Sequence, residues 1–222
     1  MPEEPKPDAE TPRQAIDRLV RSINVRPTDY DRFRGDVDQD EGRLFGGLVL
    51  AQTVVAAGRT TDRGSIHSMH AYFLRAGAPK EPIDYMIERV REGRNFLTRR
   101  VTAIQAGHTI FEASVSFTMP EDGIEHQKPM PEAPEPDLLP SWWESMRDNF
   151  PPEMAQQASR RGPGRRGWSQ PMDIRGVRGG PKALEETGLP HRTVWVKPLA
   201  TLPEDPILHA AAMAYASDSG LI

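Results

Sequence analysis

A run of thirteen residues without any charged side chain, Phe45–Ala57 (FGGLVLAQTVVAA), limits the possible folds more than any other feature of the chain. A helix at a protein surface needs one polar side, and this run does not provide one. An exposed position would therefore place many apolar groups in water. We predict a helix over this run that is buried on nearly all sides, which requires other elements of the chain to cover it.

Segments with the pattern of β-strands follow the run and can provide this cover. In Ile110–Phe117, apolar residues alternate strictly with Glu112 and two serines, which is typical of a strand with one buried face. The turn at 105–108 predicts a hairpin with the strand before it. We predict strands at Tyr30–Gly35, Ile66–Leu74, Pro82–Arg91, Phe96–Ile104 and Ile110–Phe117, and a first helix over Pro12–Ile23 with Thr11 as its N-cap. Together these segments predict an antiparallel sheet wrapped around one helix.

Proline interrupts this pattern in the middle of the chain. Ten of the 22 prolines lie between Pro120 and Pro171. Proline fixes φ and lacks a backbone donor, so neither a long helix nor a central strand fits there. The spacing of Trp142, Met146 and Phe150 predicts one short helix inside this segment. We interpret residues 120–170 as a linker between a first domain, 1–119, and a second, 171–222.

The pattern of the first domain begins again after the linker. Met172–Val177 and Arg192–Val196 are predicted strands, and Pro203–Ser217 is a predicted helix with an apolar face. No strands follow to cover this helix, which would leave a large hydrophobic surface exposed. We therefore expect the second repeat to be incomplete at residue 222.

Composition excludes several classes of protein. The net charge of −4 argues against a nucleic-acid-binding protein, which needs a basic face. The absence of cysteine excludes disulfides, thiolate metal sites and a cysteine nucleophile. No apolar run approaches 18 residues, and the N-terminus does not resemble a secretory signal. We expect a cytoplasmic protein that does not bind a membrane.

Six segments, taken together in their order and spacing, resemble acyl-CoA thioesterase II, the TesB-like family. They are GGLVLAQTVVAA (46–57), HSMHAYFLRAG (67–77), REGRNFLTRRVTAIQAG (91–107), EHQKPMP (125–131), PHRTVWVK (190–197) and LPEDPILHAAAMAYASD (202–218). The resemblance covers roughly residues 12–222. It implies an α+β fold, the double hotdog, in which two repeats each wrap a curved antiparallel sheet around a central helix. It also implies hydrolysis of fatty acyl-CoA to free fatty acid and CoA, without metal or cofactor, by a homo-oligomer.

The resemblance identifies one catalytic residue in this chain. The family's catalytic Asp, which follows the second helix, matches Asp218, where it would orient the attacking water. The family's Gln and its Thr or Ser would lie beyond residue 222. Asp218 also fits an ordinary helix end, since Ser217 to Gly220 is a common composition for one. The alternative function is a non-catalytic hotdog protein that binds acyl-CoA or acts as a scaffold, inactive without the missing half.

Gly46, Gly47 and His67 are the candidate substrate-binding residues. Free N–H groups at Gly46 and Gly47, at the start of a helix, could polarise a thioester carbonyl, or the two glycines could permit close packing. His67 and His70 are three residues apart on a strand, so we expect them on opposite faces, which excludes a shared metal site. We predict no metal site. Arg160, Arg161, Arg165 and Arg166 either bind the phosphates of CoA or belong to a solvated linker.

Overall fold

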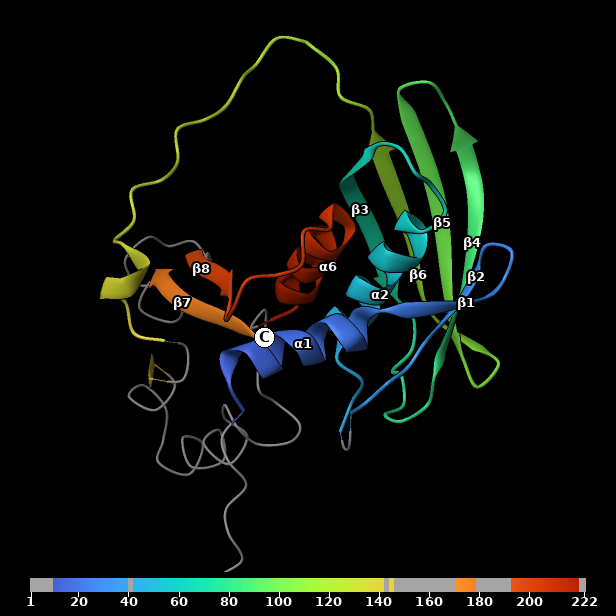
Figure 1. The fold of residues 1–222 in the computed structure, drawn as a ribbon, viewed down its shortest axis with the longest axis horizontal. Helices are drawn as coiled ribbons and strands as arrows, with labels where there is room; N and C mark the ends of the chain where they lie inside the picture. Colours follow the sequence, from blue (N-terminus) through green and yellow to red (C-terminus); the bar gives the residue numbers. More distant parts are fainter. Residues whose placement is uncertain (1–9, 40–41, 142–143, 146–170, 179–192, 220–222) are drawn as a thin grey trace, which may run out of the picture. The chain divides into compact units, whose positions relative to one another are not determined.

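The computed structural model describes residues 10–39, 42–141, 144–145, 171–178 and 193–219 (Figure 1). The chain divides into two compact units, each built from two stretches of sequence. The sheet–helix unit comprises residues 17–124 and 202–222, and the hairpin unit comprises residues 1–16 and 125–201. The domain boundaries at 119/120 and 170/171 divide the chain by repeats and stay a prediction.

An antiparallel six-stranded sheet in the order β1-β2-β4-β5-β6-β3 forms one layer of the sheet–helix unit. The four strands predicted after the apolar run are all present, and β5 and β6 form the predicted hairpin. Its turn places Ala106 and Gly107 at φ of 49° and 78°, in the left-handed region. The strands are β1 (Val25–Asp29), β2 (Arg32–Gly35), β3 (Ser65–Phe73), β4 (Ile83–Glu92), β5 (Phe96–Gln105) and β6 (His108–Thr118).

The strand predicted over Tyr30–Gly35 is present as β2 but begins two residues later, because Tyr30 and Asp31 form a tight turn. Asp31 has a φ of 51°, and the turn it makes separates β1 from β2. Arg89 holds the turn by donating from Nε to Asp31 Oδ2 at 2.7 Å. Sequence patterning could not find β1, because only its first residue, Val25, is buried, so no alternation exists to detect.

The apolar run forms α2 (Gly46–Gly58), and every residue from Gly47 to Gly58 is buried. This confirms the predicted buried helix. One side of α2 contacts β4, β5 and β6, whose inward side chains, such as Tyr85, Val101 and Phe111, are fully buried. A second helix, α6 (Pro206–Ser217), also packs on α2. The predicted first helix is present as α1 (Pro12–Ile23).

The start of α6 lies three residues after the predicted start at Pro203. Asp205 is its N-cap, and the Asp205 side chain accepts a hydrogen bond from the backbone N–H of Ile207 at 2.8 Å. Pro206 then occupies the first helical position, where its missing N–H costs nothing. Gly58 of α2 lies against this end of α6, because a Cβ on Gly58 would come within 2.8 Å of Ile207 Cδ1.

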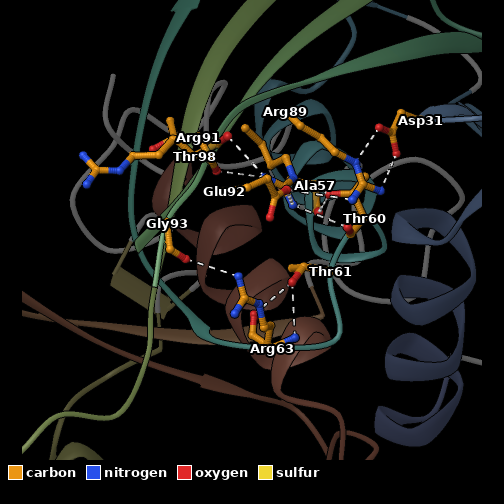
Figure 2. Close-up of polar contacts among 11 residues, drawn as sticks. Asp31, Ala57, Thr60, Thr61, Arg63, Arg89, Arg91, Glu92, Gly93 and Thr98 are labelled. Atoms are coloured by element: carbon orange, nitrogen blue, oxygen red, sulfur yellow. Dashed lines mark hydrogen bonds and ion pairs between the residues drawn. The ribbon is translucent and has the colours of Figure 1, made fainter. Parts of the chain in front are cut away.

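A buried arginine anchors the C-terminal end of α2. Arg99 occupies an inward position of β5, and its side chain is 1% exposed. Its guanidinium donates to Thr60 Oγ1 at 2.6 Å and pairs with Glu92 at 2.6 Å. Figure 2 shows Thr60, Glu92 and Ala57 gathered at this point. Thr60 Oγ1 in turn donates to the carbonyl oxygen of Ala57, near the last turn of α2. A cation at a helix C-terminus also interacts favourably with the helix dipole.

The hairpin unit contains two antiparallel strands, β7 (Met172–Arg178) and β8 (Thr193–Pro198), and a short 3₁₀ helix, η1 (Pro136–Leu138). The Arg175 guanidinium holds η1 against β7 by donating to the carbonyl oxygen of Pro136 at 2.9 Å. Residues 120–135 of the linker form no regular structure. The helix predicted around Trp142, Met146 and Phe150 lies outside the described residues.

Candidate functional site

The C-terminal end of α6 meets the N-terminal end of α2 at Asp218. Asp218 caps α6, and its Oδ2 accepts a hydrogen bond from the Gly47 backbone N–H at 2.9 Å. The two residues are 171 positions apart in the sequence. The structure thus brings together Asp218, the predicted catalytic residue, with two of the three predicted substrate-binding residues, Gly46 and Gly47.

Both glycines are needed for this close approach. A Cβ on Gly46 would lie 2.7 Å from Asp218 Oδ2 and 2.9 Å from Phe73 Cζ. A Cβ on Gly47 would lie 2.4 Å from the backbone oxygen of Tyr215 on α6. The two readings of the glycine pair, as hydrogen-bond donors and as packing residues, are therefore both supported by the geometry.

Two opposing influences act on the Asp218 carboxyl. Partial burial raises the pKa of Asp218 above its ordinary value, while hydrogen bonds from the backbone of Gly47 and Gly46 oppose the rise. The net direction is upward, which makes this carboxylate a stronger base than an exposed aspartate. Burial also raises the pKa of the neighbouring Tyr215 to about 12, so its phenol stays neutral. The Tyr215 ring packs edge-on against Phe45, with 5.0 Å between centroids.

A cavity of about 330 Å³ opens beside Asp218 and Gly46. Most of its lining is apolar, and it also contains two arginines. The lining residues are Arg43, Leu44, Gly46, Val49, Phe73, Leu74, Arg75, Ala76, Gly77, Ile110, Phe111 and Asp218. A mostly apolar cavity that also contains a few charged side chains is typical of a small-molecule site.

The loop after β3 forms one wall of this cavity and is fixed by Gln105. The Gln105 side chain accepts from the Ala78 N–H at 2.6 Å and donates to the carbonyl oxygens of Ala78 and Glu81. Gly77 of this loop packs on Leu44, since a Cβ on Gly77 would lie 2.4 Å from Leu44 Cδ2. The wall is therefore held from both sides.

His67 lies apart from the Asp218 site. Its Nε2 hydrogen-bonds to Ser116 Oγ at 2.8 Å on the face of β6 opposite the buried Val115 and Phe117. The expectation that His67 and His70 point to opposite faces is wrong. A bulge in β3 between Ile66 and Ser68 shifts the register, and His70 pairs with Ser114 on the same outer face.

The remaining predictions concern metal binding, membrane spans and the arginines of the linker. Among the described residues, no group of three or more potential ligands could hold a metal ion. In the same part of the chain, no helix is both long and apolar enough to cross a bilayer. The arginines between 160 and 166 lie outside the described residues.

Comparisons with known proteins give the family. The model of the acyl-CoA thioesterase N-terminal domain matches residues 34–118, and that of the C-terminal domain matches residues 131–222. An acyl-CoA thioesterase II, TesB2, from Mycobacterium marinum is 32% identical with a TM-score of 0.67, covering 91% of this chain and 67% of that one. The chain belongs to the acyl-CoA thioesterase family. The resemblance to the TesB-like thioesterase II proteins is confirmed.

Two further comparisons show how much of a relative this thioesterase-family chain spans and which fold it shares. Human acyl-coenzyme A thioesterase 8 is 33% identical over 209 residues, which are 88% of this chain and 63% of the human protein. The chain thus spans less than two thirds of that relative's length. A hot dog fold protein from Alicyclobacillus acidocaldarius is 20% identical with a TM-score of 0.69, covering 92% of this chain and 70% of that one. The predicted α+β double-hotdog fold class is confirmed.

Sequence reasoning missed the cavity and the residues around it. Phe73, Leu74 and Arg75 follow one another at the end of β3, and only the fold shows that they line the same cavity as Asp218. The segment FLRAG belongs to the strings that carry the resemblance, but no pattern in it indicates a cavity wall.

Proposed function

We propose that this chain takes part in the hydrolysis of fatty acyl-CoA thioesters to free fatty acid and CoA. The observation that carries the proposal is the hydrogen bond from Gly47 to Asp218 Oδ2 at the edge of an apolar cavity. This arrangement places a base with a raised pKa beside the positive end of a buried helix. In thioester hydrolysis, a base accepts the proton of the attacking water, and a positive group stabilises the charge that develops on the carbonyl oxygen.

Each part of the site has a role in this reaction. The Asp218 carboxylate orients a water molecule and accepts its proton as the water oxygen bonds to the carbonyl carbon. Negative charge then develops on the carbonyl oxygen. The Gly47 N–H stays bonded to Asp218, so what stabilises the oxyanion here is the positive end of the α2 dipole. The carbon–sulfur bond breaks, and the CoA sulfur takes the proton that Asp218 accepted from water and leaves as the free thiol. Val49 and Phe111, both buried, offer the acyl chain an apolar surface.

Release of free thiol from a series of acyl-CoA substrates, from short to long acyl chains, tests the proposal. We expect thiol release by the chain and its loss in Asp218→Asn. Absence of release with every substrate, or equal release by the variant, would contradict the proposed catalytic role. Tight binding of acyl-CoA without release would instead support the non-catalytic alternative, a protein that binds or presents acyl-CoA.

The proposal also includes a place in lipid metabolism, a cytoplasmic location and, as its last part, a homo-oligomeric state. The exposed part of α6 supports the last of these. Met213 is 77% exposed on a helix that has no charged residue, so this surface favours burial against another molecule. Light scattering coupled to size-exclusion chromatography measures the oligomeric state. A monomeric mass at all concentrations would contradict it.

A further inference from the structure

The cavity beside Asp218 is lined by buried apolar side chains and by two exposed arginines. Val49, Ile110 and Phe111 are buried and form its inner wall. Arg43 and Arg75 line the same cavity but are exposed, so they stand where it opens to solvent. A ligand that fits this lining has an apolar part that can be buried and an anionic part that stays near water.

Arg75 is held in place before any ligand binds. Its Nη1 donates to the carbonyl oxygen of Thr109 at 2.6 Å, and its backbone N–H donates to that of Ile110 at 3.1 Å. A guanidinium has five N–H donors, and within the described part of the chain the bond to Thr109 is the one that the Arg75 side chain makes, so other donors can meet a further acceptor. Preorganisation of this kind reduces the entropy lost on binding.

Asp218 lines the same cavity as Arg75, but the sequence next to Arg75 carries no negative charge. Residues 65–80 include no Asp or Glu, and no carboxylate among the described residues pairs with the Arg75 guanidinium. Arg43 differs in this respect, because Asp40 and Glu41 precede it closely in the sequence. Of the two arginines, Arg75 is therefore the better site for an anion.

We propose that the Arg75 guanidinium binds a phosphate group of the CoA half of the substrate. Phosphate oxygens match the planar fork of an arginine, and in acyl-CoA the phosphates lie in the polar CoA half, away from the acyl chain. The inference rests on the proposed function. It gives Arg75 the role that the sequence alone offered to the arginines between 160 and 166.

Equilibrium binding separates the phosphates from the rest of the substrate. Isothermal calorimetry on the full chain compares an S-alkyl-CoA thioether with the S-alkyl-pantetheine thioether, which has the same alkyl chain but no phosphate. Neither compound can be hydrolysed, so binding is measured whether or not the chain is catalytically active. We expect Arg75→Gln to weaken the CoA thioether about tenfold or more and to leave the pantetheine thioether unchanged.

Two further variants control for structure and for general charge. Arg75→Lys keeps the charge but loses the fork, so its affinity for the CoA thioether should lie between those of wild type and Arg75→Gln. Arg100→Gln removes an exposed arginine that pairs with Glu88 and should change neither affinity. Equal weakening of both thioethers by Arg75→Gln, or no weakening of either, would overturn the inference. If the wild type binds neither thioether, the proposed function itself fails.

Discussion

Asp218 is the residue at which catalysis and stability conflict. Its folded-state pKa is raised mainly by burial, so the folded chain ionises it less readily than the unfolded chain does. The stability that this group contributes is fully present below its unfolded pKa and is lost as pH rises through the folded pKa. At neutral pH the charged carboxylate therefore reduces the free energy of unfolding.

Replacement of Asp218 by Asn should separate its effect on catalysis from its effect on the free energy of unfolding. The asparagine oxygen can still accept from Gly47, but it cannot take a proton from water. We expect thioester hydrolysis to fall by about 10²–10⁴-fold. At neutral pH the free energy of unfolding should match or exceed that of wild type, and the difference should shrink in acid. Urea unfolding at several pH values measures it, and a clearly less stable variant at neutral pH would contradict the argument.

The same carboxyl sets the acid side of the pH–rate profile. Only the ionised form of Asp218 can accept a proton, so hydrolysis should decline as pH falls through its raised pKa. We expect the apparent pKa of this decline in kcat/KM to lie above the ordinary value for Asp, about 3.9. A profile that stays flat down to that value would show that Asp218 is not the base.

Gly46 and Gly47 offer a matched pair of substitutions. In Gly46→Ala the new methyl meets the ends of two side chains, Asp218 and Phe73, which can move aside. In Gly47→Ala it meets the backbone oxygen of Tyr215, which cannot move without α6. We expect Gly46→Ala to lose activity with little change in Tm, and Gly47→Ala to lose about 1–3 kcal/mol of stability. Calorimetric melting and thiol release distinguish the two, and a reversed order would contradict the packing described.

At the scale of elements, a buried glutamine fixes α2 within its unit. The Gln52 side chain donates to the carbonyl oxygens of Ser22 and Asp36 and accepts from the Tyr85 hydroxyl at 2.9 Å. It therefore ties α2 to α1, to β4 and to the segment after β2. Gly35 leaves the room for it, since a Cβ there would lie 2.1 Å from Gln52 Oε1.

Gln52→Leu should show how much this connection contributes. The leucine fills similar space but leaves a buried hydroxyl and two carbonyl oxygens without their partner. We expect the free energy of unfolding to fall by at least about 1–3 kcal/mol in urea titration. Glu88→Gln, at an exposed pair with Arg100, should stay within about 0.5 kcal/mol of wild type. Equal stability of Gln52→Leu and wild type would mean that the connection is dispensable.

The elements that could be predicted from sequence are those with strong patterning. The charge-free run gave α2, and strict alternation gave β6, because burial imposes both patterns. The side of the sheet on which His67 lies could not be predicted, since one extra residue at a bulge reverses the faces. Asp218 was found through family resemblance alone. Its partner Gly47 lies 171 residues away, and no local pattern connects them.

At the scale of the whole molecule, the sheet–helix unit is built from two distant stretches of the chain. Residues 17–124 supply the sheet and α2, and residues 202–222 supply α6. No residue of α6 is Asp, Glu, Lys or Arg, and Ala211 on it is fully buried. Apolar burial between the two helices should therefore hold the two stretches together without a covalent connection.

Cleavage of the linker tests this directly. Residues 120–132 are all exposed, so a specific protease site inserted after Lys128 should be accessible and tolerated. After cleavage we expect both fragments to elute together in size-exclusion chromatography and to separate only in denaturant. Met213→Lys, on the exposed part of α6, should not change this result, whereas Ala211→Lys should release the fragments, because it would bury a charge against α2. Separation of the wild-type fragments under native conditions would show that α6 depends on the linker to stay in place.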